Sequence, residues 1–242
     1  MIVHNLYPHG DSRGTTFWKA AHRLLRMADV FIHFTEASRA LFRDDIGVPD
    51  QKSVVHAFPV DQDNSPPVSD AQRGKSTLLF VGVNQERKEL HQLLNPKSRP
   101  VGFRILASGF ENEAEFRHQY GFDIEVPASP IKWLGRHLSR HELEDALHKS
   151  SILVLNQPHQ LNSGLMWMAI SRGVRVVAPE TPAFLELAAQ LGPVWLHLFQ
   201  VPLGRSDLQN RANDFLDIPH EPPPTLGSFC SLAKCIKALV GD

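Results

Sequence analysis

Two kinds of hydrophobic pattern alternate along the chain. In short runs nearly every residue is apolar, as in strands buried on both faces, and between them apolar residues recur at helical spacing. The pattern predicts strands at Ile2–His4, Asp29–Phe34, Ser53–Ala57, Thr77–Gly82, Phe103–Ala107, Ile131–Leu134, Ile152–Leu155 and Val174–Ala178. It predicts helices at Thr15–Met27, Thr35–Phe42, Lys88–Leu94, Asn112–Gln119, Ser139–Lys149, Ser163–Arg172, from Thr181-Pro182 onward, and at Phe229–Val240.

Strands that alternate with helices predict a parallel sheet covered on both faces, which is a doubly wound, Rossmann-like α/β fold. Residues 59–76 interrupt the alternation with prolines, acidic residues and little apolar content, which favours a linker. We therefore predict a partial N-terminal α/β domain at 1–58, a linker at 59–76 and a C-terminal α/β domain at 77–242.

Composition narrows the function classes. The chain has 242 residues, of which 42% are hydrophobic and 21% charged, and its formal net charge is -1. Such a chain is globular and has no overall field that would recruit nucleic acid or an anionic membrane. We find no apolar run long enough to span a bilayer and no signal peptide. The spacing of Cys230 and Cys235 does not put them on one helix face, so we expect no disulfide and a cytoplasmic location.

In open parallel sheets, ligands bind where strands end and helices begin, and four such junctions stand out. At Asn162-Ser163-Gly164 a helix is expected to start with unpaired backbone N–H groups. Gly164 has no side chain to block a phosphate at that helix end. The alternative is an ordinary helix cap, because many helices start in this way.

The second junction is Gly82–Lys88, where a strand ends in glycine and Lys88 follows within reach of the crevice. A lysine there can neutralise a diphosphate as a point charge. The alternative is a solvated lysine in a polar loop, which is the commoner state of any single lysine.

The remaining two junctions carry weaker signals. Ala107-Ser108-Gly109 is a tight turn after a strand and can simply reverse the chain. After Leu134-Gly135, Arg136 can meet a phosphate or stack on a base. His137 and His141 are four residues apart, but a cap at Ser139 separates them and no third ligand is evident, so we expect no metal site.

His4 is singled out by its place at the end of the first predicted strand. A neutral imidazole there can hydrogen-bond a substrate hydroxyl or phosphate, whereas the alternative is a structural histidine that caps the strand. His9 and Arg13 share the polar loop that follows.

The ordered series of segments resembles the C-terminal two-thirds of a GT-B glycosyltransferase of the large group-1, family 4-like class. The resemblance covers nearly the whole chain, from VHNLYPHG with its histidine through LLFVGVNQERKEL and FRILASG to IKWLGRHLSRHELEDALHKSSILVLN and NSGLMWMAISRGVRVVAPETPAFLEL. It implies that His4 is the active-site histidine and that His9 and Arg13 lie on the acceptor side. It implies that Lys88, Ser163, Gly164, Leu165 and Glu186 bind the donor, and with the junction residues Gly82, Arg136 and Asn162 they form the predicted donor-binding set.

The sequence also departs from that family's pattern. The arginine that usually accompanies the lysine falls at Val83, and the paired glutamates fall at Gln160 and Met168. The second of these glutamates normally holds the ribose. Glu186 matches a glutamate further downstream, with Glu180 as a nearby substitute. The departures weaken the donor site and leave the retaining outcome typical of the class open.

The leading hypothesis is a glycosyltransferase homologue that transfers a sugar from a nucleotide-diphosphate sugar to a saccharide or lipid-linked acceptor, without a cofactor or metal. One alternative is a non-catalytic nucleotide- or sugar-binding remnant. Another is a doubly wound domain of some other nucleotide-using enzyme, although the dinucleotide fingerprint is absent. By the resemblance the chain starts inside the N-terminal domain, about 100 residues short of a complete enzyme. An incomplete domain allows self-association, and contact with the inner face of the membrane is compatible with the family.

Overall fold

The computed structural model describes residues 23, 25, 27–59, 76–95, 99–122, 131–156, 163–200, 205–217 and 229–240. The predicted strand Ile2–His4, most of the predicted helix Thr15–Met27 and most of the predicted linker lie outside these residues. The alternation of strands and helices that the sequence predicts is present throughout the described part.

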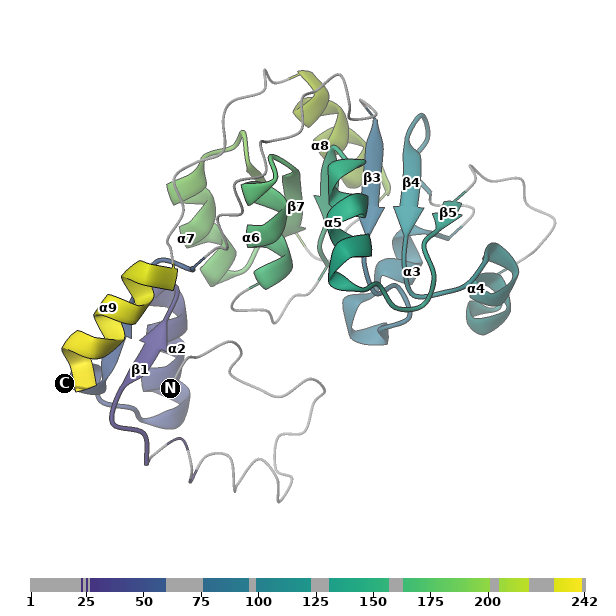
Figure 1. Ribbon diagram of the computed structural model, residues 1–242. Coiled ribbons are helices and arrows are strands. Elements are labelled where there is room, and N and C mark those ends of the chain that lie inside the picture. The colour runs from purple at the N-terminus through teal and green to yellow at the C-terminus, as the bar shows by residue number, and fades with distance from the viewer. Residues whose placement is uncertain are drawn as a thin grey trace.

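Among the described residues, six strands form one parallel sheet, which we call the large sheet (Figure 1). Its strands are β3 (Thr77–Phe80), β4 (Arg104–Ala107), β5 (Ile131–Trp133), β6 (Ile152–Val154), β7 (Arg175–Pro179) and β8 (Leu196–Phe199). They are arranged in the order β5-β4-β3-β6-β7-β8. The chain therefore starts in the centre, builds outward to one edge and then to the other, which is the doubly wound order. The predicted fold class is confirmed.

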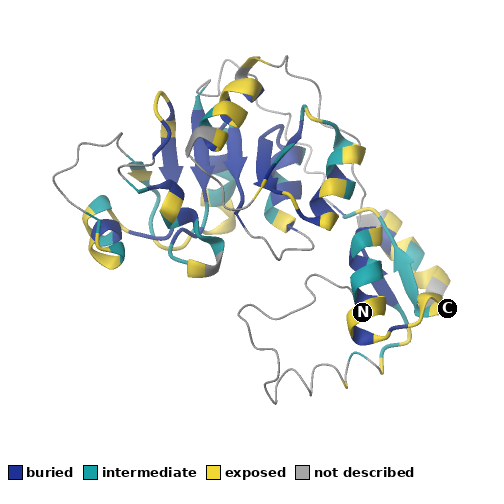
Figure 2. Cartoon of the chain, turned by 180° about the vertical axis from the view of Figure 1, so that it is seen from behind, coloured by how far each residue is buried: buried dark blue, intermediate teal, exposed yellow. Residues whose placement is uncertain are grey.

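Helices cover both faces of the large sheet because its strands are apolar on both sides. The helices are α3 (Leu90–Leu93), α4 (Glu113–Tyr120), α5 (Arg140–His148), α6 (Gly164–Ser171), α7 (Pro182–Leu191) and α8 (Arg205–Asp217). Leu78 and Phe80 of β3 pack in the cluster that α3, α4 and α8 cover, whereas Leu79 packs in the cluster of α5, α6 and α7. Figure 2 shows the resulting buried strands. None of the described helices has the length and apolar character to cross a membrane.

The helix starts expected from the sequence carry the expected caps. Ser139 and Glu142 form a complete capping box at α5, and the hydroxyl of Thr181 accepts the backbone N–H of Phe184 at α7. Pro182 occupies the first turn of α7, where its missing N–H costs nothing. These starts are predictable because the bonds join residues three positions apart.

Two elements of the large-sheet region were not predicted, namely β8 and α8. A signal for both is present: Leu196–Phe199 is a short apolar run, and Leu208, Ala212 and Phe215 recur at helical spacing. In the structure these three side chains are fully buried against the sheet. The sheet therefore extends one strand further than the sequence pattern indicated.

A second, smaller unit precedes the large sheet in sequence. We call it the small sheet: β1 (Phe31–His33) pairs in parallel with β2 (Ser53–Val55). Around it lie α2 (Glu36–Ile46), the 3-10 turn η1 (Asp50–Lys52) and, from the other end of the chain, α9 (Phe229–Val240). Figure 1 shows α9 alongside α2 and β1.

The two faces of β1 are covered by different helices. Phe31 packs with Phe42 of α2, and Ile32 packs with Leu232 of α9. Leu232 thus brings α9, at the end of the chain, against the first strand of the small sheet. The small sheet is therefore covered by a helix from the other end of the chain, since Ile32 and Leu232 are 200 positions apart.

Candidate functional site

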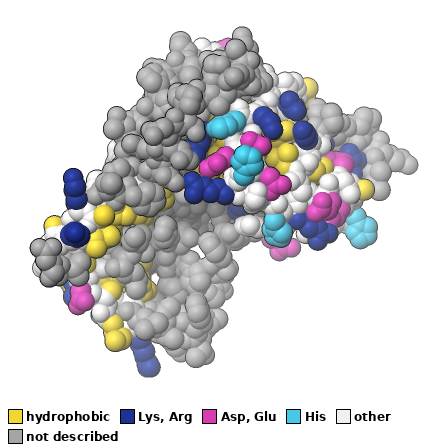
Figure 3. All heavy atoms as spheres, viewed as in Figure 1, with side chains coloured by type: hydrophobic (Ala, Val, Ile, Leu, Met, Phe, Trp, Pro, Cys, Tyr) yellow, Lys and Arg dark blue, Asp and Glu magenta, His cyan; other side chains and the backbone are white. Residues whose placement is uncertain are grey.

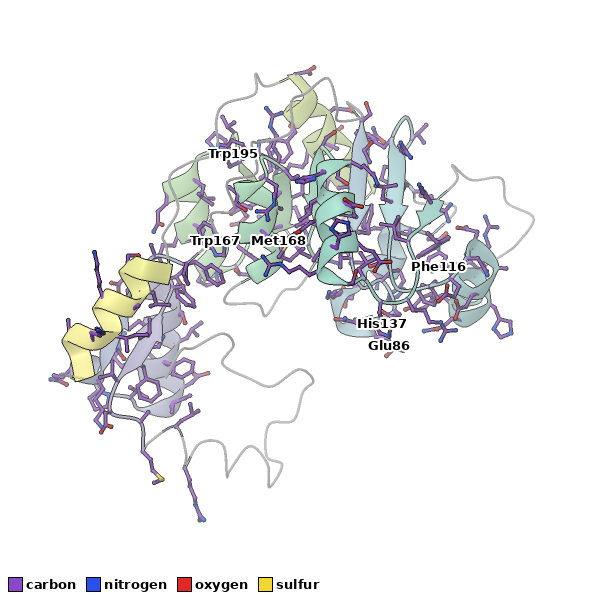
Figure 4. All side chains as sticks on the ribbon, in the orientation of Figure 1. Glu86, Phe116, His137, Trp167, Met168 and Trp195 are labelled. Carbon is purple, nitrogen blue, oxygen red and sulfur yellow. The ribbon has the colours of Figure 1, made fainter. Side chains whose placement is uncertain are left out.

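A topological switch point lies between β3 and β6, the two central strands of the large sheet. The segment after β3 leads to α3 on one face, whereas the segment after β6 leads to α6 on the other. Two connections that diverge in this way open a crevice at the carboxyl ends of the strands. Figure 4 shows Glu86 and His137 at this end of the sheet, and Figure 3 shows that histidine, acidic and basic side chains gather on the large-sheet part of the surface.

The loops that follow β3, β4 and β5 are joined to one another by hydrogen bonds. The N–H of Gly82 donates to the hydroxyl of Ser108 (3.1 Å), the N–H of Val83 to the carbonyl of Ser108 (2.8 Å) and the N–H of Gly109 to the carbonyl of Gly135 (2.9 Å). Gly109 has φ +129, and a Cβ there would lie 2.8 Å from the nitrogen of Val83. Only glycine lets the loops approach this closely, so the predicted turn at Ser108-Gly109 is also a packing contact.

A buried ion-pair network fixes α4 beneath these loops. Glu113 accepts hydrogen bonds from Arg99 (2.6 Å), Arg117 (2.8 Å) and the indole of Trp133 (3.3 Å). Burial alone would raise the pKa of Glu113, but the hydrogen bonds from the two arginines outweigh it and hold the pKa below its usual value. Because α4 and β5 share this carboxylate, the loops at their ends keep a fixed spacing.

Lys88 lies at the carboxyl end of β3, in the 3-10 turn η2 (Glu86–Lys88). Its Nζ donates to the carbonyl of Val81 (3.1 Å). A Cβ on Gly82, which has φ +73, would lie 2.9 Å from that nitrogen. The structure thus brings Gly82 and Lys88 together, with the ammonium folded over the strand end where the crevice begins.

The start of α6 forms the opposite wall of the crevice. The hydroxyl of the buried Ser163 accepts the N–H of Met166 (3.1 Å), and its carbonyl accepts the N–H of Trp167 (3.2 Å). Within the described residues this leaves the first two N–H groups of the helix, those of Gly164 and Leu165, without a partner. Gly164 is exposed, and Leu165 is half-buried. Asn162 lies outside the described residues.

An aromatic stack connects this helix to the small sheet. Phe34 lies against Phe58 with 4.7 Å between ring centroids, and Phe58 stacks on Trp167 at 5.7 Å and 14°. A Cβ added to Gly164 would meet the Phe58 ring at an ordinary 3.9 Å. The backbone therefore does not require glycine at this position, and a small substituent fits without strain.

Arg136 is engaged in ion pairs on the surface. Its guanidinium pairs with Glu115 and lies 3.9 Å from Glu111, both in the α4 region. Binding a phosphate would require Arg136 to exchange these partners. His137 is exposed and lies before α5, whereas His141 is in its first turn. Among the described residues, no group of three histidine, cysteine or carboxylate side chains is placed to hold a metal ion.

Glu186 reaches across from α7 to the first turn of α2. One carboxylate oxygen accepts the N–H of Glu36 and the other that of Ala37, both at 2.9 Å. The next N–H, of Ser38, donates to the hydroxyl of Thr35 (3.0 Å). In the structure Glu186 thus caps a helix of the other unit, a role that the sequence did not indicate.

The departures from the family pattern have a structural counterpart. Val83 is fully buried in the cluster beneath α3 and α4, so this position faces the core. Met168 is half-buried against the cluster beneath α5, α6 and α7. His4, His9, Arg13 and Gln160 lie outside the described residues. Among the predicted site residues that the structure describes, Lys88 and the start of α6 follow the paired strands β3 and β6.

Sequence reasoning missed Asn156, which follows β6 at the same edge of the sheet. The side chain is 4% exposed, and its Oδ1 has no hydrogen-bond partner in the described part of the chain. A polar residue directly after the apolar run Ile152–Leu155 was the available signal, but the sequence gives no measure of burial.

Comparison with known proteins rests on structure alone, because no family model and no curated protein matches the sequence. Sucrose-phosphate synthase from Thermosynechococcus elongatus superposes with a TM-score of 0.71 at 17% identity, over 96% of this chain and 63% of that protein. The lipopolysaccharide outer core galactosyltransferase WaaB gives 0.60 at 15% identity, over 91% of this chain and 64% of WaaB. The chain has the GT-B fold.

A third structure with this fold is Anabaena HepE, which was determined in complex with UDP-glucose. It superposes with a TM-score of 0.57 at 16% identity, over 89% of this chain and 62% of HepE. The chain spans less than two thirds of the length of each of these three GT-B proteins. At identities this low, the superpositions establish the fold alone. The chemistry has to be argued from the residues of the crevice.

Proposed function

We propose that this chain is a glycosyltransferase homologue that binds a nucleotide-diphosphate sugar in the crevice between β3 and β6. The observation that supports the proposal is that Lys88 and the start of α6 follow β3 and β6, the two paired strands at the switch point of the large sheet. The chemistry would be transfer of the sugar to a saccharide or lipid-linked acceptor in polysaccharide or glycoconjugate synthesis.

The charge of a leaving diphosphate explains why these groups suit the reaction. Breaking the glycosidic bond to the donor leaves negative charge on the diphosphate, and fixed N–H dipoles and cations stabilise that charge as it develops. The N–H groups of Gly164 and Leu165 and the positive end of α6 supply the dipoles, and Lys88 supplies the cation. Such a site needs no metal or other cofactor. Arg136 would join it by leaving Glu115.

Residues outside the described ranges complete the proposal. His4 would orient the sugar or the acceptor, with His9 and Arg13 on the acceptor side, and Asn162 would extend the donor site next to Ser163. We place the protein in the cytoplasm, with contact at the inner face of the membrane and self-association through the N-terminal unit as further parts of the proposal. Light scattering of the purified chain tests self-association directly.

A thermal-shift screen against UDP, GDP, ADP and their sugar conjugates tests donor binding. A ligand that binds only the folded state raises the melting temperature by mass action, so a shift confined to one nucleotide identifies the donor class. Lys88→Ala removes the cation and Gly164→Val places bulk at the start of α6, and each should reduce the shift. Lys132→Ala, at an exposed position on β5, is the matched control. Equal shifts in all four proteins would rule out this crevice as the donor site.

The second candidate is a non-catalytic nucleotide- or sugar-binding protein. It is favoured by the absence of a cation at the buried Val83 and of a carboxylate at Met168, and by the engagement of Arg136 with Glu115. The two candidates differ in turnover. An enzyme releases free nucleotide from its bound sugar conjugate, with acceptor or slowly with water, whereas a binding protein returns the conjugate intact. Chromatography of the incubated conjugate separates these outcomes.

A further inference from the structure

Asn156 lies just past the carboxyl end of β6, next to the switch point. Phe80 of β3 is paired with Val154 of β6, so Asn156 follows β6 at the same edge of the sheet at which Gly82 follows β3. The N–H of Leu155 donates to the carbonyl of Val177 (2.8 Å), so extended pairing continues past the end of β6.

The alternation of side chains along the strand gives the side on which Asn156 lies. Val154 packs in the cluster covered by α3, α4 and α8, and Leu155 packs in the opposite cluster. Asn156 follows on the side of Val154, which is the side toward which the loop after β3 leads. The alternation therefore places the carboxamide on the face of the sheet that α3, α4 and α8 cover, at the end of β6.

The carboxamide oxygen is buried, and it makes no hydrogen bond to any residue that the structure describes. Asn156 is 4% exposed, and its Oδ1 is shielded from solvent. The great majority of buried polar atoms in folded proteins are paired, since an unpaired acceptor loses its hydration without compensation. An apolar side chain of similar volume would fill the same space at lower cost. Asn156 Oδ1 is one of seven buried side-chain atoms without a hydrogen-bond partner among the described residues, and it lies just past the strand at the switch point.

We propose that Asn156 Oδ1 accepts a hydrogen bond from a hydroxyl or N–H group of the bound nucleotide sugar. This inference rests on the proposed function and assigns one part of the ligand to one residue. The diphosphate of the donor carries only acceptors at neutral pH, so it cannot be the partner of an acceptor oxygen. Lys88 and the start of α6 hold the diphosphate, and Asn156 recognises the sugar or nucleoside.

The test compares two ligands on the full chain. Wild type, Asn156→Leu and Asn156→Ala are titrated by calorimetry with inorganic pyrophosphate and with the nucleotide sugar that stabilises the wild type most. Asn112→Leu is the matched control, because the oxygen of Asn112 already accepts the N–H of Glu115 (3.0 Å) at the start of α4. The melting temperature of each unliganded protein is recorded as well.

We expect both Asn156 variants to bind the nucleotide sugar about tenfold more weakly and pyrophosphate as tightly as the wild type does, because only the sugar conjugate loses a hydrogen bond. We expect unliganded Asn156→Leu to melt at or above the wild-type temperature, whereas Asn112→Leu melts lower and binds both ligands normally.

Three results would overturn the assignment. A marked fall in the melting temperature of unliganded Asn156→Leu would show that the oxygen has a partner within the protein. Equal weakening of both ligands would place Asn156 in support of the diphosphate site, and unchanged affinity for both would remove it from the crevice. If the wild type itself binds neither ligand, the proposed function fails and this assignment fails with it.

Discussion

The large and small sheets are both parallel, but they differ in how many strands lie between helices. In the large sheet the central strands are buried, as all four residues of β3 show, whereas in the small sheet β1 is buried and the three residues of β2 are each half-buried (Figure 2). The large sheet closes its own core with the helices that connect its strands. The small sheet is covered on one face by α2, which connects its two strands. Among the described residues, its other face is covered by α9 from the end of the chain.

The difference shows how each unit is stabilised. A pair of strands is marginal by itself, because it buries too little apolar surface to offset the loss of chain entropy. The small sheet is instead held by contacts with remote segments: Leu232 of α9, the carboxylate of Glu186 on α7, and the Phe34–Phe58–Trp167 stack. We infer that the large sheet sets the global stability, and that the small sheet opens at lower free energy.

The largest expected effect comes from removing one buried phenylalanine from each unit. Phe80→Ala in β3 and Phe42→Ala in α2 each delete a fully buried ring, at a cost of about 3–5 kcal/mol. Phe80→Ala should lower the stability of the whole protein, whereas Phe42→Ala should open α2 and β1 alone. Hydrogen exchange read by mass spectrometry distinguishes the two. If Phe42→Ala exposed β3 and β6 to the same extent, the two sheets would be one cooperative unit.

Acid should loosen the small sheet first through His33. Burial, with a smaller contribution from Arg39, lowers the pKa of His33 to about 4, and its ring nitrogens lie 3.3 Å from the hydroxyls of Ser38 and Ser53. The unfolded chain binds a proton near pH 6.5 and the native chain does not. Stability is therefore full above pH 6.5 and falls toward pH 4, by on the order of 2–3 kcal/mol.

His33→Gln keeps hydrogen-bonding capacity and removes the titration, so it should flatten this part of the profile. His91 and His197, whose pKa values burial also lowers, supply the same slope in the large-sheet region. Exchange rates of α2 between pH 7 and pH 4.5, compared in wild type and His33→Gln, isolate the His33 contribution. Equal slopes in both proteins would contradict it.

Glu186→Ala should weaken the connection between the two units. The change leaves the N–H groups of Glu36 and Ala37 without their acceptor, at a cost of about 1–2 kcal/mol. We expect faster exchange in α2 and unchanged exchange in β3 and β6. Glu180→Ala, at an exposed neighbouring position, is the control. Faster exchange in both variants, or in neither, would mean that the carboxylate does not hold α2.

Ser139→Ala should have the smallest effect and should be confined to the large-sheet region. It removes one half of the capping box at α5, which costs about 1 kcal/mol at a solvent-exposed helix start. A melting-temperature decrease with unchanged exchange in α2 is the expected result. A change in α2 exchange would show that the large sheet transmits small local losses to the small one.

Local patterns in the sequence predicted much of the fold. The starts of α5 and α7 follow from Ser139 and Thr181, because a helix cap joins residues only three positions apart. The strands of the large sheet could be predicted from apolar runs. A strand that lies between two layers of helices is buried on both faces, so nearly all of its residues are apolar. β8 is also an apolar run, Leu196–Phe199, but it was not predicted because the run is short and no helix or turn signal beside it marked a strand. The sequence predicted Lys88 and the start of α6 as two separate strand-to-helix junctions, and the strands that precede them, β3 and β6, are paired in the structure.

Other properties depend on which distant residues meet, and only the tertiary structure decided them. Glu186 meets Glu36, 150 positions earlier, and Arg136 meets Glu115, 21 positions earlier. A carboxylate or guanidinium carries the same charge whether it binds a ligand or pairs within the protein. The residue type alone therefore does not identify its partner. The burial of Asn156 likewise comes from strands and helices that surround it from elsewhere in the chain. Periodicity and capping are local and can be read along the chain, whereas burial, ion pairing and the order of strands are set by the free energy of contacts that form only when the chain has folded.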